Sequence, residues 1–292
     1  MVNIDNLTER WKFSLKYAPM EIKNNKEIVL SAVKADGLAL EFASSNLKRD
    51  REIVLEAVKQ CGLALRYATE NLRADKFVVM TAVEQCGEAL EYASERLRDD
   101  KEVVSVAVRE KGLAFKYASE KLRNDREVLN LAITQDWVAF GYATERLRGN
   151  RAIVLSAVKL NGRTLNRALE WLRDDKAVVM TAVARCGEAL EYASERLRND
   201  KEVVLLAVKQ NGEALKFASE RLRSDRDVVL KAVKSETRGG VALAYASERM
   251  RNDKEVVMSA IMADKRAVVF ASEKLQNDKD VLSIAINQQR SK

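Results

Sequence analysis

The chain has 292 residues, of which 47% are hydrophobic and 33% are charged, and this balance predicts a folded protein and excludes a disordered one. Its formal net charge is +7. It contains no histidine, which excludes histidine-assisted serine or cysteine catalysis and removes the commonest zinc ligand.

The first 15 residues, MVNIDNLTERWKFSL, lack the apolar core of a signal peptide. No stretch approaches the apolar length of a membrane-spanning helix, so we expect none. The three cysteines, Cys61, Cys86 and Cys186, are odd in number and widely spaced, which predicts a reducing compartment and no disulfide framework. We expect a cytoplasmic protein, or one delivered into a host cell without a conventional signal peptide.

One pattern of 25 residues recurs along most of the chain. The spacing lengthens to 28 residues once, between Arg226 and Lys254, and the extra residues fall within Ser235–Gly240. Periods of about 20–50 residues are typical of solenoids and related arrays. The units begin at Lys26, Arg51, Lys76, Lys101, Arg126, Arg151, Lys176, Lys201, Arg226 and Lys254, and a last, incomplete unit begins at Lys279.

The repeats define the organisation of the chain. Residues 1–25 form an N-terminal half repeat or cap, because LKYAPMEIKNN matches the second half of a unit. Residues 26–278 form ten repeats, and residues 279–292 form a C-terminal half repeat. We expect 1–292 to be a single continuous domain, with a longer turn and a protruding contact at 235–240.

The first half of each unit is predicted to be a helix. It follows an aspartate, or Asn150 in one unit, which is a favourable residue for capping the first turn. Apolar residues then recur at helical spacing, as in Val203, Val204, Ala207 and Val208. A glycine usually ends the helix, and we expect it to adopt the left-handed conformation of a helix C-cap.

The second half of each unit is predicted to be another helix, as in EALKFASERLR, which buries Ala214, Leu215, Ala218 and Leu222. An aromatic residue recurs beside this stripe and should form a ladder that packs between repeats. The ladder consists of Phe42, Tyr67, Tyr92, Tyr117, Tyr142, Tyr192, Phe217, Tyr245 and Phe270.

Two such helices bury too little apolar surface to fold alone, so neighbouring units must share one core. The sequence therefore predicts an all-α fold, a right-handed α-solenoid of ten 25-residue two-helix repeats flanked by half repeats. The last helix carries Val281, Leu282, Ile284 and Ile286, and end-to-end self-association is one way to cover them.

The motif A-V-K-x-x-G-x-A-L-x-Y-A-S-E-x-L-R-x-D-K-E-V-V occurs, for example, as AVKQNGEALKFASERLRSDRDVV from Ala207 to Val229. It resembles the repeat family called domain of unknown function 4116, and the resemblance covers nearly the whole chain. The resemblance implies a helical array and brings no established activity and no catalytic residues. Since some proteins with such repeats are candidate host-directed effectors, it also implies that role as an expectation.

One unit departs from the pattern and supplies candidate binding residues. Arg167 replaces the ladder aromatic, and Arg163 lies four residues earlier on the same helix face. Arg167 should lie between Tyr142 and Tyr192, either as a cation–π sandwich or as a basic notch for a partner's carboxylate or phosphate. Asn166 occupies the variable position before the ladder residue. Trp137, at a glycine position, and Trp171, at an exposed position, are either local packing or interface anchors.

No phosphate-binding loop, nucleophile elbow or distinctive carboxylate pair occurs, so we predict no enzyme activity, catalytic residue, cofactor or metal site. The predicted function is a scaffold that binds one or more protein partners along an extended surface, as an effector or within a larger assembly. The alternative is a nucleic-acid-binding array, because residues 151–292 contain 27 basic and 20 acidic residues. Variable positions such as Glu41, Arg66 and Lys116 would set specificity.

Overall fold

The computed structural model describes residues 11 and 14–287. Residues 1–10, 12–13 and 288–292, parts of the two predicted half repeats, lie outside the described residues. Every regular element within 14–287 is a helix, and the elements stack as tandem repeats, so the predicted all-α solenoid is confirmed. Contacts divide the chain into two compact units, Met1–Thr144 and Glu145–Lys292. The single domain and the right-handed sense stay predictions.

Each regular repeat contains three helical elements where the sequence pattern predicted two. In the 25-residue repeat that begins at Lys201 they are the ten-residue α16 (Lys201–Gln210), the six-residue 3-10 helix η10 (Gly212–Phe217) and the four-residue α17 (Glu220–Arg223). Extended backbone at Ala218 separates the last two. Ser219 then caps α17, since its hydroxyl accepts a hydrogen bond from the Leu222 N–H at 3.3 Å. The second half of the repeat is therefore not one continuous helix.

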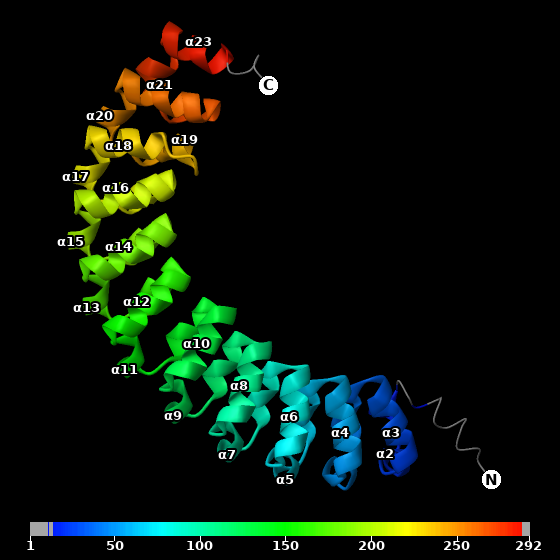
Figure 1. Cartoon of the computed structure of the whole chain (residues 1–292). Coiled ribbons are helices and arrows are strands. Elements are labelled where there is room, and N and C mark those ends of the chain that lie inside the picture. The colour runs from blue at the N-terminus through cyan, green and yellow to red at the C-terminus, as the bar shows by residue number, and fades with distance from the viewer. Residues whose placement is uncertain (1–10, 12–13, 288–292) are drawn as a thin grey trace. The chain divides into compact units, whose positions relative to one another are not determined.

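The first compact unit, Met1–Thr144, is built from repeats with the same succession of a long helix, a 3-10 helix and a short helix (Figure 1). Its long helices are α3 (Lys26–Ala35), α4 (Arg51–Gln60), α6 (Lys76–Gln85), α8 (Lys101–Glu110) and α10 (Arg126–Gln135). Its 3-10 helices are η1 (Leu15–Tyr17), η2 (Gly37–Phe42), η3 (Leu47–Arg49), η4 (Gly62–Tyr67), η5 (Gly87–Tyr92), η6 (Gly112–Tyr117) and η7 (Trp137–Tyr142). Its short helices are α2 (Met20–Lys23), α5 (Glu70–Arg73), α7 (Glu95–Arg98) and α9 (Glu120–Arg123).

The second unit has the same parts and one irregular repeat. Its other long helices are α12 (Arg151–Leu160), α14 (Lys176–Arg185), α18 (Arg226–Val233), α21 (Lys254–Ala263) and α23 (Lys279–Asn287). Its other short helices are α11 (Glu145–Arg148), α13 (Glu170–Arg173), α15 (Glu195–Arg198), α19 (Gly239–Ala242), α20 (Glu248–Arg251) and α22 (Glu273–Gln276). Its other 3-10 helices are η8 (Gly162–Arg167), η9 (Gly187–Tyr192), η11 (Leu243–Tyr245) and η12 (Lys265–Phe270).

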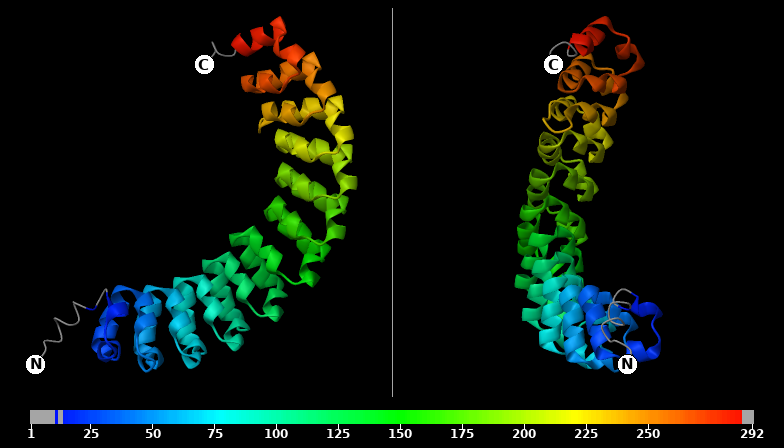
Figure 2. Two further views of the ribbon diagram at one scale, coloured as in Figure 1. Left: turned by 180° about the vertical axis from the view of Figure 1, so that it is seen from behind. Right: turned by 90° about the vertical axis from the view of Figure 1, so that its right-hand side faces the viewer.

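The core of each unit runs continuously from repeat to repeat. Long helices pack on the next long helix, and 3-10 helices pack on the next 3-10 helix, as Figure 2 shows within each unit. The predicted apolar positions of α16 are fully buried, and so are Ala214, Leu215 and Leu222. Backbone hydrogen bonds also join repeats: the Ser219 N–H, for example, donates to the Arg198 carbonyl at 3.0 Å. Each repeat therefore completes its core with its neighbours, as expected of a solenoid.

An aspartate precedes every long helix except α3 and α12, which follow Asn25 and Asn150, and it has two roles. Asp200 caps α16 as predicted, since its carboxylate accepts hydrogen bonds from the N–H groups of Glu202 and Val203 at 3.0 and 3.3 Å. It also accepts a hydrogen bond from the ammonium group of Lys176, one repeat earlier, at 2.8 Å. That hydrogen bond, and the helix cap with it, holds the pKa of Asp200 below its ordinary value.

These ion pairs recur along both units and were not predicted. In the first unit, hydrogen bonds to Asp50 and Glu52 raise the pKa of Lys26 to about 12. Because both partners remain partly exposed, each pair alone stabilises the fold only weakly. The bridges from one repeat to the aspartate of the next are Lys26–Asp50, Arg51–Asp75, Lys76–Asp100, Lys101–Asp125, Arg151–Asp175, Lys176–Asp200, Lys201–Asp225, Arg226–Asp253 and Lys254–Asp278.

The predicted left-handed conformation of the turn glycines is wrong. No glycine of the described residues has a positive φ. Where glycine occupies this position, the next repeat approaches too closely for a side chain, although Trp137 and Lys265 begin η7 and η12 at the equivalent position. A Cβ on Gly112 would lie 2.7 Å from the Ala132 carbonyl oxygen, and a Cβ on Gly187 would lie 2.5 Å from the Ala207 carbonyl oxygen. The glycine therefore sets the distance between repeats.

We predict that Gly112→Ala destabilises the array by about 1–3 kcal/mol, because the new methyl group would force η6 away from α10. The measurement is the free energy of unfolding in urea. Gly141→Ala is the matched control: it lies in a 3-10 helix of the same unit, at a position where other repeats carry long side chains. Equal losses in the two variants would contradict the role assigned to close approach.

We also predict acid sensitivity of the aspartate bridges. A folded-state pKa below the unfolded value adds stability above pH of about 4, and that stability is lost as the pH falls through the folded pKa. Asp200→Asn keeps the cap and removes the titrating group, so the variant should lose less stability than wild type between pH 5 and pH 2. Asp200→Ala also removes the cap and should cost about 1 kcal/mol at pH 7. Urea unfolding followed by circular dichroism would test both, and identical pH profiles for wild type and Asp200→Asn would refute the assignment.

Candidate functional site

The 3-10 helices carry a row of aromatic rings, most of them half-buried, at the predicted ladder positions. The residue before each ring, or before Arg167 in the repeat that lacks the ring, lies at the surface and differs between repeats. We call these residues the variable row. In the first unit it consists of Glu41, Arg66, Glu91, Lys116 and Gly141, and in the second of Asn166, Glu191, Lys216, Ala244 and Val269.

Charged members of the variable row contact the rings. The guanidinium of Arg66 lies 5.0 Å from the ring centre of Tyr67 and 5.8 Å from that of Tyr92, in the next repeat. The ammonium group of Lys116 lies 4.5 Å from the Tyr117 ring. These distances fit cation–π contacts. The rings therefore hold the charged side chains in place on the surface.

Acidic members contact the ring hydroxyl instead. The Tyr67 hydroxyl donates a hydrogen bond to Glu41 at 3.1 Å. Burial raises the pKa of Tyr67, and the hydrogen bond to Glu41 raises it further. Tyr67 is thus a neutral donor at physiological pH. Both signs of charge are consequently positioned by the same row of rings.

The repeat that begins at Arg151, in which Arg167 replaces the ladder aromatic, brings three of the predicted binding residues together. Arg163, Asn166 and Arg167 lie on η8 and are exposed. Arg163 forms an ion pair with Glu188 of the next repeat at 2.6 Å. Within the described part of the chain Arg167 makes no cation–π contact, and its carbonyl accepts a hydrogen bond from the Arg148 guanidinium at 3.5 Å. Of the two η8 arginines, only Arg167 is left without an ion pair among the described residues.

The two predicted tryptophan anchors differ in exposure. Trp171 lies on α13 with 55% of its surface exposed. Trp137 begins η7, in the first unit, and is half-buried. Leu169 stands where other repeats have serine or threonine, and it lies against Gly149, whose added Cβ would be 2.9 Å from the Leu169 side chain. Glycine at 149 and leucine at 169 therefore compensate for each other.

The insertion at 235–240 folds back on the preceding repeat. Helix α18 has eight residues in place of ten, and Arg238 follows with a left-handed φ of 53°. The Gly212 N–H donates to the Thr237 carbonyl at 2.9 Å. The Arg238 guanidinium pairs with Glu213 at 2.7 Å, and Glu213 also accepts from Lys216 at 3.0 Å. The predicted longer turn is thus present, and it is fixed at its base.

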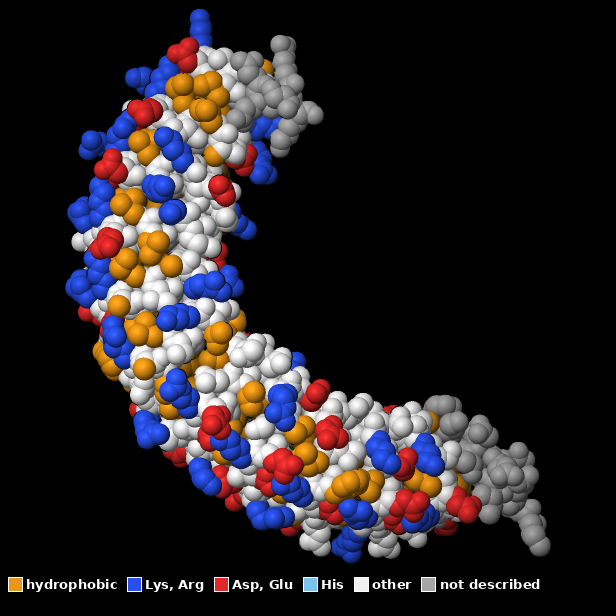
Figure 3. Space-filling model, viewed as in Figure 1, with side chains coloured by type: hydrophobic (Ala, Val, Ile, Leu, Met, Phe, Trp, Pro, Cys, Tyr) orange, Lys and Arg blue, Asp and Glu red, His pale blue; other side chains and the backbone are white. Residues whose placement is uncertain are grey.

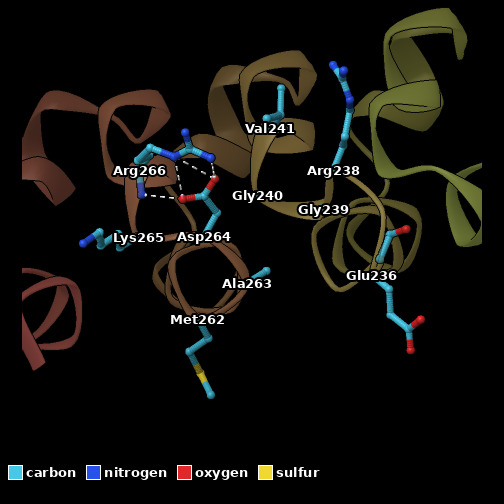
Figure 4. A pocket seen from close by; sticks show the side chains of 11 residues that line it. Glu236, Arg238, Gly239, Gly240, Val241, Met262, Ala263, Asp264, Lys265 and Arg266 are labelled. Carbon is cyan, nitrogen blue, oxygen red and sulfur yellow. Dashed lines mark hydrogen bonds and ion pairs between the residues drawn. The ribbon is translucent and has the colours of Figure 1, made fainter. Parts of the chain in front are cut away.

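On its other side the inserted turn borders an open groove with a volume of about 1070 Å³ (Figure 4). The opposite wall comes from the end of α21 and the start of η12. There Asp264 and Arg266 form a forked pair, with hydrogen bonds of 2.8–3.1 Å. The groove is lined by Ser235, Glu236, Arg238, Gly239, Gly240, Val241, Met262, Ala263, Asp264, Lys265 and Arg266. The sequence signal for this site was the insertion itself.

A third surface is the edge made by the short helices. Figure 3 shows Lys and Arg side chains along this edge in the second unit, with acidic side chains among them. Some of the cations reach back to the preceding repeat, as Arg196 does to Asp174 at 3.1 Å. The surface is therefore mixed in charge.

Three further features bear on chemistry. Cys61, Cys86 and Cys186 are free. In residues 14–287 no group of three or more Cys, Asp or Glu side chains is arranged to hold a metal ion. The described helices include none with the length and apolar character needed to cross a membrane.

A comparison with protein families finds one family model that matches nearly the whole repeat array. The family model described as Domain of unknown function (DUF4116) matches residues 7–48, 25–73, 50–98, 75–116, 100–148, 150–198, 175–223, 200–251, 225–276 and 253–291. No curated protein and no solved structure matches the chain. The overlapping matches follow the 25-residue period, and the chain belongs to the Domain of unknown function (DUF4116) family.

Proposed function

We propose that this chain is a non-enzymatic scaffold whose variable row binds one or more protein partners. The observation that carries the proposal is the alternation of charge in the first unit, where Glu41, Arg66, Glu91 and Lys116 occupy the same position in successive repeats. An extended partner can meet one such side chain per repeat. The order of charges then selects its sequence, because like charges placed opposite each other are unfavourable.

Alternation of sign favours a protein partner over a nucleic acid. A phosphate backbone repeats one charge, and its binding depends on cations at each contact. In the first unit every second charged position of the variable row is acidic. The net excess of basic residues in 151–292 stays the same, but Lys176 and Lys201 are already occupied by ion pairs with the following repeat. Nucleic-acid binding remains the alternative proposal.

Preorganisation supports the same proposal. The variable row stands on 3-10 helices that pack on one another within each unit, and rings hold Arg66 and Lys116 in position. A partner therefore loses little additional freedom in ordering these side chains, which favours affinity. Repeated geometry suits recognition better than catalysis, which needs a unique arrangement of groups.

The proposal includes a reducing compartment, the cytoplasm of the producing cell or of a host cell. The three free thiols support this placement. We also propose self-association through α23, because its Leu282 and Ile286 are 38% and 53% exposed. Molecular mass measured at several concentrations would test it, and a monomer at every concentration would contradict it.

We predict that Arg66→Glu with Lys116→Glu strongly weakens capture of the specific partner while the fold is kept. The double change makes the whole charged row of the first unit acidic. The measurement is quantitative affinity capture from the native host, followed by titration with the purified partner. Loss of binding should be at least about tenfold, as expected when charged contacts become repulsive.

The matched control is Lys34→Glu with Arg109→Glu, which changes the net charge equally at exposed positions outside the variable row. This variant should bind normally. Equal loss in both variants would point to net charge alone and would contradict the proposal. Titration of labelled single-stranded and duplex nucleic acid forms the second arm, and tight, salt-dependent binding there would favour the alternative function.

A further inference from the structure

We propose that the groove between α19 and η12 binds an extended peptide of a partner protein in which an acidic side chain adjoins an aliphatic one. The groove lies in the second unit, uses none of the charged variable-row residues, and is a distinct site. This proposal therefore goes beyond the function assigned to the variable row.

The size and openness of the groove favour a peptide. Its volume of about 1070 Å³ is at the upper limit of sites for small molecules, which are typically about 300–1,000 Å³ and enclose most of the ligand. Here the groove is open, with walls from two successive repeats (Figure 4). An extended chain can lie along such a groove with side chains on either wall.

One wall supplies the contacts for an acidic side chain. Asp264 accepts hydrogen bonds from the Nε and one terminal nitrogen of Arg266, and this fixes the plane of the guanidinium. The other terminal nitrogen makes no hydrogen bond within the described residues, and 82% of the Arg266 side chain is exposed. Lys265 is adjacent and forms no ion pair in the described part of the chain. Arg266 offers a preoriented donor to a carboxylate, and Lys265, which points away from it in Figure 4, adds positive charge to the same wall.

The groove also supplies apolar surface for an aliphatic side chain. Val241 and Ala263 line the groove, and Met262, which is 67% exposed, lies at the edge opposite Val241 (Figure 4). Methionine is flexible and polarisable, so it adapts to different aliphatic partners. Val241 lies on the same side of the groove as the Arg266 guanidinium (Figure 4), which is why the two peptide side chains are expected to adjoin.

The other wall is rigid and limits the charge that the groove accepts. Arg238 is tied to Glu213, and a Cβ on Gly240 would lie 2.5 Å from the Asp264 Cβ, so the inserted turn is packed tightly against η12. Glu236 lies across the groove from Arg266 (Figure 4). A carboxylate there repels a ligand with continuous negative charge. This arrangement favours a peptide with local acidity over a phosphate polymer.

The test is a fluorescence-anisotropy titration of the full chain with a labelled eight-residue peptide in which one leucine–glutamate pair is flanked by serine residues. The expected result is saturable binding. Lys265→Glu should raise the dissociation constant about tenfold or more, because repulsion replaces a charged anchor. Lys265 is exposed and carries no ion pair among the described residues, so folding should persist, and circular dichroism would confirm it.

Three controls make the outcome decisive. Lys231→Glu, an equal change of charge outside the groove, should leave the affinity unchanged. Arg66→Glu with Lys116→Glu should also leave it unchanged, which separates this site from the variable row. A leucine–lysine peptide and an oligothymidylate of similar length should bind at least tenfold more weakly. No saturable binding of the acidic peptide, equal affinity for the lysine peptide, tighter binding of the oligothymidylate, or no effect of Lys265→Glu would overturn the proposal.

Discussion

The close approach of one repeat's glycine to an alanine carbonyl of the next repeat is the constraint on which the arrangement of each unit depends. At Gly187 this approach leaves no room for a Cβ, and it brings η9 against α16. Buried alanines such as Ala207 and Ala214 then leave space for neighbouring helices, and the remaining volume is filled by valine and leucine. Because these short elements are unstable alone, the spacing set by glycine decides whether the shared core can form.

Polar groups reinforce this spacing. Asp200 caps its own helix and accepts a hydrogen bond from Lys176, so one carboxylate serves a local element and a contact between repeats. Each bridge is partly exposed and weak, yet the same bridge recurs through both units. The array therefore distributes polar stabilisation evenly instead of concentrating it in one buried network. Even stabilisation keeps successive repeats in register, and a row of surface side chains needs that register to recognise an extended partner.

Sequence periodicity was sufficient to predict the all-α repeat fold, the capping aspartates and the buried positions, because helical burial leaves a regular apolar pattern. It did not predict the break at Ala218, although the recurring Ser219 is a strong capping residue, since the apolar spacing continues across the break. The sequence analysis explained the glycines wrongly by turn geometry. Their real role is close approach to a residue 20 positions later, as between Gly112 and Ala132, and a local sequence pattern does not show this contact. Lys–Asp bridges between repeats were missed for the same reason.

The two candidate sites also differ in how much of each could be predicted from the sequence. The variable row follows the period, so its position could be predicted from sequence, whereas its cation–π contacts required the structure. The groove arises where the period fails: the insertion shortens α18, places Arg238 at a positive φ and borders the start of η12. A regular array offers equivalent surfaces in every repeat, and an insertion is the simplest way to make one of them unique. Recognition along the row and recognition at the groove can therefore change independently, because the insertion alters neither the glycine spacing nor the caps of the regular repeats.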